Sequence, residues 1–313
     1  MDNWILPGKT LIMGLSSYCG ARCLMCPFEQ YNNNNRSMSF DLFKKCVDEG
    51  SKHGLEYIDT CLMGDSLLDP GLDEKIAYTK TNYPWIKFYA SSQGMSATPN
   101  KVCGKVDTLH LSIYGTSKEV YEKVHRGGVN YEVAMKNIEE ILSYPKDKRP
   151  YLIFTFLLLP ENEFQLEEWI RKWESLVDEV IVWKPHNWAG LYNTGCPIDY
   201  DKARSCQRPA GGPLTVWVNG DVTVCCFSWD KSMKIGDANK QSLEDIYFSK
   251  RRKEIIKIHS MNSFHNCGLA CENCDQILDR NDALVYTNKG RITGQAIVSG
   301  DYVVRFVNDN GGA

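Results

Sequence analysis

Hydrophobic residues along the first two thirds of the chain recur with two alternating periods. Short apolar runs are typical of buried strands, and longer segments with apolar residues every three or four positions are typical of amphipathic helices. The apolar runs predict six strands, at residues 10–17, 55–64, 86–92, 107–115, 151–159 and 178–185. The segments between them predict helices, at residues 39–54, 71–84, 98–104, 116–144 and 163–176, with the fourth broken at Gly127 and Gly128.

Strands that alternate with helices are the pattern of right-handed βα units around a parallel sheet. Because six units are predicted rather than the eight of a closed TIM barrel, we expect an α/β fold with a partial (β/α)6 TIM-like barrel. In barrels of this kind the functional side chains gather at the carboxyl ends of the strands. The loops that follow the predicted strands are therefore the expected place of the chemistry.

The last third of the chain follows a different pattern. Residues 186–206 are rich in Gly, Asn and Pro and are interpreted as a linker, and residues 214–227 predict a β-hairpin around Asn219 and Gly220. An amphipathic helix is predicted at 241–259, and residues 283–307 alternate like strands with Gly turns. The predicted domains are the barrel (1–190), a small β-hairpin plus helix domain (191–282) and a β-rich C-terminal extension (283–313).

Charge and hydropathy narrow the classes of partner. The 313 residues carry a net charge of −3 with no polybasic run, so no binding to nucleic acid is expected. No run of about 18 apolar residues predicts a membrane span. The N-terminal segment lacks the basic and apolar regions of a secretory signal, so the expected compartment is the cytoplasm.

The cysteine content changes the picture, because 13 cysteines in a reducing compartment favour metal or redox chemistry over disulfides. Four scattered cysteines are expected to be small buried side chains: Cys46, Cys61, Cys103 and Cys196. Three others form a C-x3-C-x2-C motif, "CGARCLMC", directly after the first predicted strand: Cys19, Cys23 and Cys26. Three thiolates can hold three corners of a cubane iron–sulfur cluster and leave the fourth iron open. A zinc site that borrows a fourth ligand is the alternative.

A second set of cysteines lies in the last third of the chain. Its members flank the predicted hairpin and end the region after the predicted helix: Cys206, Cys225, Cys271 and Cys274. Four thiolates could close a fully ligated iron–sulfur site, or hold a structural zinc ion.

The first motif and its position resemble the radical S-adenosylmethionine (SAM) superfamily, whose hallmark is C-x3-C-x2-C after the first strand of a partial (β/α)6 barrel. The resemblance implies a [4Fe–4S] cluster whose open iron binds SAM. It also implies an external one-electron donor such as flavodoxin or ferredoxin, and cleavage of SAM to a 5′-deoxyadenosyl radical that abstracts hydrogen from carbon.

The resemblance also implies residues that contact SAM at the strand ends. Gly64 and Asp65 stand where the family has a Gly-Gly-Glu-like segment for the SAM amino group, and Asp65 keeps the carboxylate. Small polar and basic residues at later strand ends are expected to contact other parts of SAM: Ser92, Ser112 and Arg126. Met25 and Phe28 are expected near the adenine. Two positions depart from the common motif, because Gly20 replaces the frequent Asn and Met25 replaces an aromatic residue.

The second cysteine set resembles the auxiliary-cluster domains called SPASM and Twitch. Because no cysteine follows Cys274, the resemblance is to the shorter Twitch form, with one auxiliary [4Fe–4S] cluster held by the four cysteines named above. The resemblance to the family covers roughly residues 10–276. Cys226 follows Cys225 on a predicted strand and so points to the opposite side, where its thiol could donate hydrogen to a substrate radical or could simply pack. Cys267 is a further spare thiol.

The expected reaction is oxidation or epimerisation at a carbon of a small polar substrate, as in the aminocyclitol dehydrogenases and sugar or peptide epimerases that the chain resembles. Only 18 residues precede Cys19, so no extra peptide-recognition domain is expected there. Lys184, His186 and Asn187, after the sixth strand, are candidate substrate contacts or acid/base groups. Two alternatives stay open: a radical SAM enzyme that epimerises or cross-links a ribosomal peptide, and a zinc-stapled α/β binding protein.

Overall fold

The computed structural model describes residues 4–31, 36–278, 280 and 283–289. All six strands of the predicted barrel are present, and each lies inside its predicted range. Their bounds are β1 (Thr10–Met13), β2 (Tyr57–Asp59), β3 (Lys87–Ser92), β4 (Thr108–Ser112), β5 (Tyr151–Leu157) and β6 (Glu179–Trp183).

Helices follow the strands as the periodicity predicts. Their bounds are α1 (Phe40–Lys52), α2 (Leu72–Asn82), α3 (Pro99–Val102), α4 (Lys118–His125), α5 (Tyr131–Ser143) and α6 (Leu166–Trp173). Side chains cap several of them; the Ser39 hydroxyl, for example, accepts a hydrogen bond from the backbone N–H of Leu42. The predicted break at Gly127 separates α4 from α5, and Asn130 caps the new helix.

The second region also contains the predicted hairpin, formed by β7 (Leu214–Val216) and β8 (Asp221–Thr223), with β9 (Lys234–Asp237) beside it. Its helices are α7 (Arg208–Gly211), α8 (Leu243–Tyr247) and α9 (Lys250–Ser260). The single helix expected at 241–259 is therefore wrong. Ser249 interrupts it, because its backbone is not helical and its side chain accepts a hydrogen bond from the N–H of Arg252.

All ten described strands form one sheet, in the order β10-β6-β5-β4-β3-β2-β1-β7-β8-β9. Strands β1 to β6 are parallel neighbours, as predicted. The sequence did not reveal that β7 pairs in parallel with β1, so that the hairpin of the second region continues the sheet of the first. Strand β10 (Leu284–Thr287) pairs antiparallel with β6, while residues 290–313 of the expected extension lie outside the described residues. The predicted domain boundaries stay a prediction.

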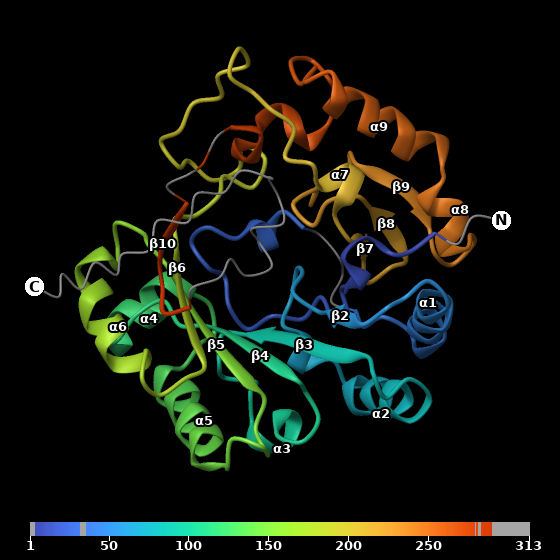
Figure 1. The fold of residues 1–313 in the computed structure, drawn as a ribbon. Coiled ribbons are helices and arrows are strands. Elements are labelled where there is room, and N and C mark those ends of the chain that lie inside the picture. The colour runs from blue at the N-terminus through green and yellow to red at the C-terminus, as the bar shows by residue number, and fades with distance from the viewer. Residues whose placement is uncertain (1–3, 32–35, 279, 281–282, 290–313) are drawn as a thin grey trace, which may run out of the picture.

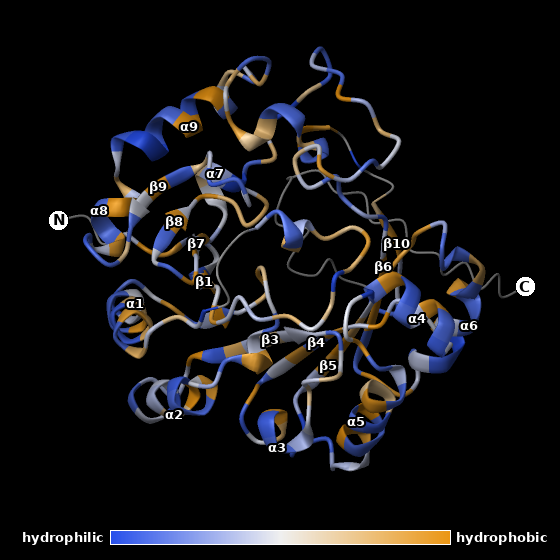
Figure 2. Ribbon diagram, turned by 180° about the vertical axis from the view of Figure 1, so that it is seen from behind, coloured by the Kyte–Doolittle hydropathy of each residue, from blue (hydrophilic) through white to orange (hydrophobic). Residues whose placement is uncertain are grey.

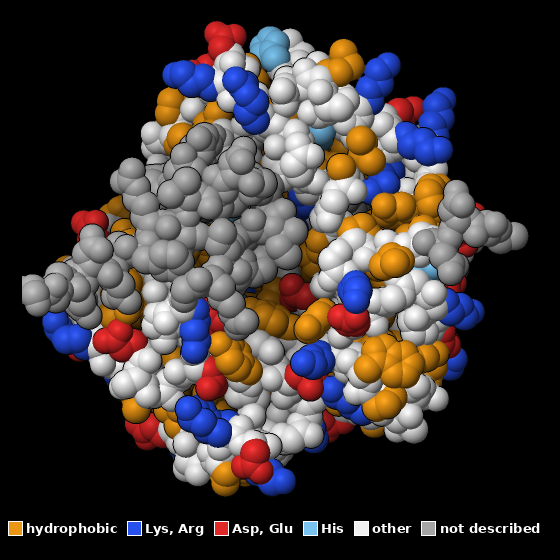
Figure 3. All heavy atoms as spheres, viewed as in Figure 1, with side chains coloured by type: hydrophobic (Ala, Val, Ile, Leu, Met, Phe, Trp, Pro, Cys, Tyr) orange, Lys and Arg blue, Asp and Glu red, His pale blue; other side chains and the backbone are white. Residues whose placement is uncertain are grey.

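Helices α1 to α6 lie along the outer side of this curved sheet, and the strands surround the interior (Figure 1). Hydrophobic and hydrophilic stripes on the helices are visible in Figure 2. The outward residues of the strands, among them Ile58, Phe88, Leu109 and Phe154, are at most 1% exposed and pack in one core with helix residues such as Phe43. The opposite face of each strand therefore points into the interior. The space-filling view shows hydrophobic and charged side chains around a hollow near the middle of the molecule (Figure 3).

Candidate active site

The three cysteines of the first motif lie in the loop between β1 and α1. The loop turns tightly, because the N–H of Cys26 donates to the carbonyl oxygen of Cys23 at 3.0 Å, and Pro27 then starts a short 3-10 helix. The guanidinium of Arg22 donates to the carbonyl oxygen of Cys19 at 2.8 Å and lies over the ring of Phe28. The loop is thus braced by its own side chains.

The end of α4 holds this loop from the other side. The backbone N–H groups of Arg22 and Gly128 donate to the carbonyl oxygens of His125 and Gly20, at 2.8 and 2.9 Å. Gly127 has a φ of +72°, and a Cβ atom there would lie 2.6 Å from the carbonyl oxygen of Gly20. The Gly-Gly pair that breaks the helix therefore also lets the cysteine loop approach.

The thiols of this loop are close enough to influence one another. Burial raises the pKa of Cys19 to about 11 and that of Cys26 to about 12. Burial raises the pKa of Cys23 as well, and the charges of Cys26 and Cys19 add to this effect. The Nδ1 atom of His125 lies 3.3 Å from the Cys23 sulfur. Three partly buried thiols with mutual repulsion fit a cationic iron centre, because metal binding replaces the protons that they would otherwise keep.

The segment expected to bind the SAM amino group lies beside the cysteine loop. Gly64 has a φ of +117°, and a Cβ atom there would be 2.1 Å from the carbonyl oxygen of Ser16, so only glycine fits. The Asp65 carboxylate is 2% exposed and accepts hydrogen bonds from the hydroxyls of Ser92 and Ser96 and from the N–H of Leu67. Ser92 thus positions Asp65, and this arrangement makes Asp65 the carboxylate that could meet a SAM amino group.

The other expected SAM contacts lie in different surroundings. Ser112 is on the inward face of β4 and is half-buried. Met25 is 5% exposed and packs against the side chains of α4, whereas the partly buried ring of Phe28 lies against the Arg22 guanidinium. Arg126 lies on the rim with its side chain 46% exposed and forms an ion pair with Glu29 at 3.4 Å.

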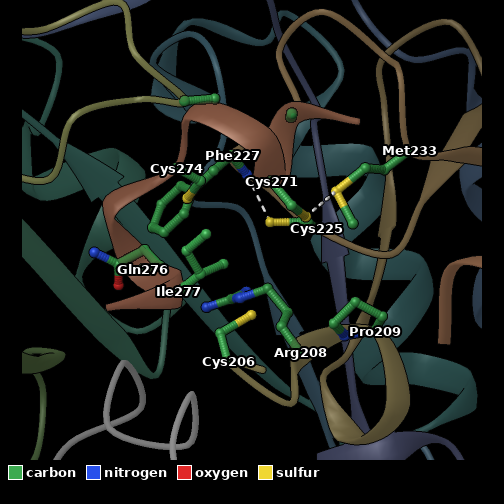
Figure 4. A pocket seen from close by; sticks show the side chains of 12 residues that line it. Cys206, Arg208, Pro209, Cys225, Phe227, Met233, Cys271, Cys274, Gln276 and Ile277 are labelled. Carbon is green, nitrogen blue, oxygen red and sulfur yellow. Dashed lines mark hydrogen bonds between the residues drawn. The ribbon is translucent and has the colours of Figure 1, made fainter. Parts of the chain in front are cut away.

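The four cysteines of the second set line a single pocket in the second region (Figure 4). The empty volume of the pocket is about 390 Å³, which includes space open to solvent. The other lining residues include Arg208, Phe227 and Met233. Burial raises the pKa of Cys271, and the charges of Cys274 and Cys206 raise it further. Convergence of these thiols from the segment before α7, the end of the hairpin and the C-x2-C turn fits a cluster with four protein ligands.

Two further side chains contact cysteines of this pocket. The Nε2 atom of His259 on α9 lies 3.3 Å from the Cys271 sulfur, and burial lowers the pKa of this histidine to about 4, so the ring is neutral. The guanidinium of Arg208 donates to the Cys226 sulfur at 3.3 Å. Burial alone would lower the pKa of Arg208, but the neighbouring cysteines at 226, 225 and 206 raise it, so it stays charged.

The candidate substrate residues after β6 differ from one another. Lys184 is exposed and its backbone N–H donates to the carbonyl oxygen of Ala283. The ring of His186 stacks on Phe227 at 3.9 Å between centroids, and burial lowers its pKa to about 3. Both ends of the Asn187 amide bond to the backbone of residues 273 and 275. Asn187 thus fixes the turn that carries Cys274, which explains its position without a substrate.

The inward face of the sheet carries a polar surface that was not predicted from the sequence. Neighbouring strands place polar side chains opposite one another in register: Asp59 with Tyr89, Ser91 with His110, and Ser112 with Thr155. Cys61, expected to be a small core residue, lies two residues after Asp59, and its N–H donates to the Asp59 carboxylate at 2.8 Å. In the sequence, this polar surface is indicated by the alternation of apolar and polar residues in the strands "YID", "KFYASS" and "TLHLS".

Within the ranges described above, no helix is long and apolar enough to cross a membrane. In the same part of the chain, no three Cys, His, Asp or Glu side chains are spaced to hold a single metal ion.

The fold and the two cysteine sets define a class of protein, an iron–sulfur enzyme built on a partial barrel. The sequence model of the radical SAM superfamily matches residues 13–172, and that of SPASM, an iron–sulfur cluster-binding domain, matches residues 206–275. The chain therefore belongs to the radical SAM superfamily and carries a SPASM-type domain. This membership implies a [4Fe–4S] cluster with SAM and auxiliary iron–sulfur binding, as expected, and sets aside the zinc-stapled binding protein.

Solved structures of radical SAM enzymes have the same fold. BtrN in complex with AdoMet and 2-DOIA superposes with a TM-score of 0.62 and 16% identity, over 91% of this chain and 100% of that one. Streptococcus suis SuiB bound to S-adenosylmethionine gives a TM-score of 0.60 and 14% identity, over 88% and 72%. The enzyme anSMEcpe with bound AdoMet gives 0.53 and 15%, over 88% of each chain. No curated protein sequence matches the chain.

Proposed function

We propose that this radical SAM enzyme oxidises or epimerises a carbon centre of a small polar substrate of the sugar or aminocyclitol class. The observation that carries this proposal is the polar inward face of β2 to β5. It offers carboxylate, hydroxyl and imidazole groups from adjacent strands, which is the set of donors and acceptors that a polyhydroxylated ligand needs.

The first cluster would be held by Cys19, Cys23 and Cys26, and the auxiliary cluster by the four cysteines that line the pocket of Figure 4. When bound, the clusters and SAM would supply a radical that removes one hydrogen atom from the substrate carbon and an acceptor for the electron that oxidation releases. The chain's own groups then decide the product.

Asp59 is the group proposed to take the hydroxyl proton when a C–OH centre becomes a carbonyl. It ends β2 on the inward face, and burial raises its pKa, which suits a carboxylate that takes up a proton near neutral pH. Cys226 is the group proposed to return a hydrogen atom when the outcome is epimerisation. The side-chain hydrogen bond with its neighbour Cys225, and then burial, raise the pKa of Cys226, which favours the protonated thiol that a hydrogen-atom donor needs.

Substrate-dependent formation of 5′-deoxyadenosine tests the proposal. The anaerobically purified enzyme, with SAM and a low-potential reductant, is incubated with a panel of sugars and aminocyclitols and a matched panel of peptides. We expect at least a tenfold stimulation by a member of the first panel, lost in Asp59→Asn and kept in Cys103→Ala. Stimulation by peptides alone would overturn the substrate class in favour of the peptide-modifying alternative.

Solvent deuterium distinguishes the two outcomes. Epimerisation should place deuterium from D2O on the product carbon and stop in Cys226→Ala while SAM cleavage continues. Oxidation should give a product two hydrogens lighter without deuterium at that carbon, and Cys226→Ala should still make it.

A further inference from the structure

A chain of hydrogen bonds ends on one of the proposed auxiliary-cluster ligands. The backbone N–H of Gln207 donates to the Ser205 hydroxyl oxygen at 3.1 Å. That oxygen lies 3.0 Å from Nδ1 of His259, and Nε2 of the same ring lies 3.3 Å from the Cys271 sulfur. His259 is 3% exposed, so water does not compete for these contacts.

The two contacts of His259 indicate which ring nitrogen carries the proton. Cys271 as a cluster ligand is a thiolate that can only accept, so a hydrogen bond with Nε2 needs the proton on Nε2. The Ser205 hydroxyl, whose oxygen accepts from the Gln207 N–H, can then donate its own proton to Nδ1 of the neutral ring. His259 therefore presents an N–H group to a ligand sulfur.

A positively charged group, Arg208, points into the same pocket. Figure 4 shows the guanidinium of Arg208 among the four cysteines, and Arg208 is 8% exposed. Its Nε atom is buried and has no hydrogen-bond partner. Two buried cations pair with carboxylates: Lys75 with Asp69, and Arg280 with Asp275. Among the described residues, no carboxylate forms an ion pair with Arg208. A buried guanidinium so placed is suited to an anionic neighbour.

We propose that His259 and Arg208 are positioning residues that raise the reduction potential of the auxiliary cluster. Reduction adds one negative charge, and an N–H dipole and a fixed cation beside the sulfurs stabilise the reduced form more than the oxidised form. The consequence rests on the proposed function: a raised potential favours loss of an electron from the substrate, and hence oxidation, over epimerisation.

The test is an anaerobic redox titration of the full-length holoenzyme, followed by EPR. The signal of the first cluster is recognised because it changes when SAM is added. His259→Phe and Arg208→Gln should each lower the equilibrium constant for reduction of the auxiliary cluster about tenfold, which is about 59 mV for one electron. The matched variants His259→Gln, which keeps an N–H donor, and Arg208→Lys, which keeps the charge, should retain most of the wild-type potential.

An unchanged auxiliary potential in both His259→Phe and Arg208→Gln, with wild-type iron content, would overturn the proposal. If His259→Phe loses iron or does not fold, Ser205→Ala takes its place, because it removes the hydroxyl that pairs with Nδ1 and leaves the ring of His259. Ser205→Ala should shift the potential in the same direction by a smaller amount, and no shift in it and in Arg208→Gln would again overturn the proposal. The titration contains no substrate, so its result is independent of the proposed substrate class.

Discussion

The backbone N–H of Asp65 donates a hydrogen bond of 2.7 Å to the carbonyl oxygen of Tyr18. Tyr18 directly precedes Cys19, so this bond attaches the segment after β2 to the loop that follows β1. The close fit of Gly64 against Ser16 supports the same contact. Backbone contacts therefore hold the proposed amino-group acceptor next to the proposed cluster ligands.

We expect Asp65→Asn to weaken SAM binding about tenfold or more while the first cluster is retained. The variant keeps the shape of the side chain but removes the charge, and hydrogen bonds to charged groups contribute about 1.5–3 kcal/mol. Titration of SAM into the reduced enzyme, monitored by the EPR change of the first cluster, gives the affinity. Asp73→Asn, at a carboxylate that is 67% exposed, is the control. Wild-type affinity in Asp65→Asn would refute the assignment.

Two glycines with the same φ allow the effect of backbone strain to be distinguished from the effect of a steric clash. Gly127 and Gly104 both have a φ of +72°, but only at Gly127 would a Cβ atom meet another atom closely, the carbonyl oxygen of Gly20. Gly104→Ala should cost about 1 kcal/mol of stability and leave the cofactors in place. Gly127→Ala should in addition displace the cysteine loop and lower the iron content toward that of one cluster. Equal iron contents in the two variants would contradict this role of Gly127.

Removal of a single thiol should affect one cluster only. Cys19→Ala is expected to abolish reductive cleavage of SAM and to lower the iron content from about eight to about four per chain. Cys274→Ala should lower the iron content similarly but leave SAM cleavage in the absence of substrate. Cys103→Ala, which removes a thiol outside both sets, should keep both properties. Iron analysis and 5′-deoxyadenosine formation measure them, and SAM cleavage by Cys19→Ala would contradict the ligand assignment.

His110 should make stability depend on pH. Burial lowers the pKa of His110 to about 4, against about 6.5 in the unfolded chain. The unfolded chain therefore takes up the proton first, so this contribution to stability is complete above pH 6.5 and is lost as the pH falls toward 4. The loss between pH 6.5 and 5 is up to about 2 kcal/mol. Thermal unfolding of His110→Gln should show a smaller decrease over this range, and parallel decreases would disprove the assignment.

Much of the fold could be predicted from the chain, because strands and helices follow local hydrophobic periods. The six barrel strands, the helix break at Gly127 and the hairpin at Gly220 are examples. The interruption at Ser249 was missed, because the apolar period continues across it and only the cap reveals a new helix. The parallel pairing of Leu11 with Leu214 was also missed, because periodicity does not specify which distant strand is a neighbour.

Some features of the candidate site could also be predicted from the sequence, and others could not. The first cysteine set could be predicted from its short, characteristic spacing, whereas the second set, spread over residues 206–274, was expected from its resemblance to auxiliary-cluster domains. The contact of Ser92 with SAM stays a prediction, and the structure adds that its hydroxyl donates a hydrogen bond to Asp65 and that its neighbour Ser91 faces the interior. The inward position of Asp59 was also not predicted. Alternation along a strand separates two faces, but only the packing of the helices decides which face is the interior.

The sequence by itself determined the superfamily, the order of the barrel strands and the two cysteine sets, since these are properties of neighbouring residues. Only the tertiary structure decided that His125 meets Cys23, that His259 and Arg208 reach the second cysteine set, and that the hairpin extends the barrel sheet. His125 and Cys23 are 102 positions apart. Contacts at such separations depend on strand register and on the docking of whole elements, which no local pattern of residues records.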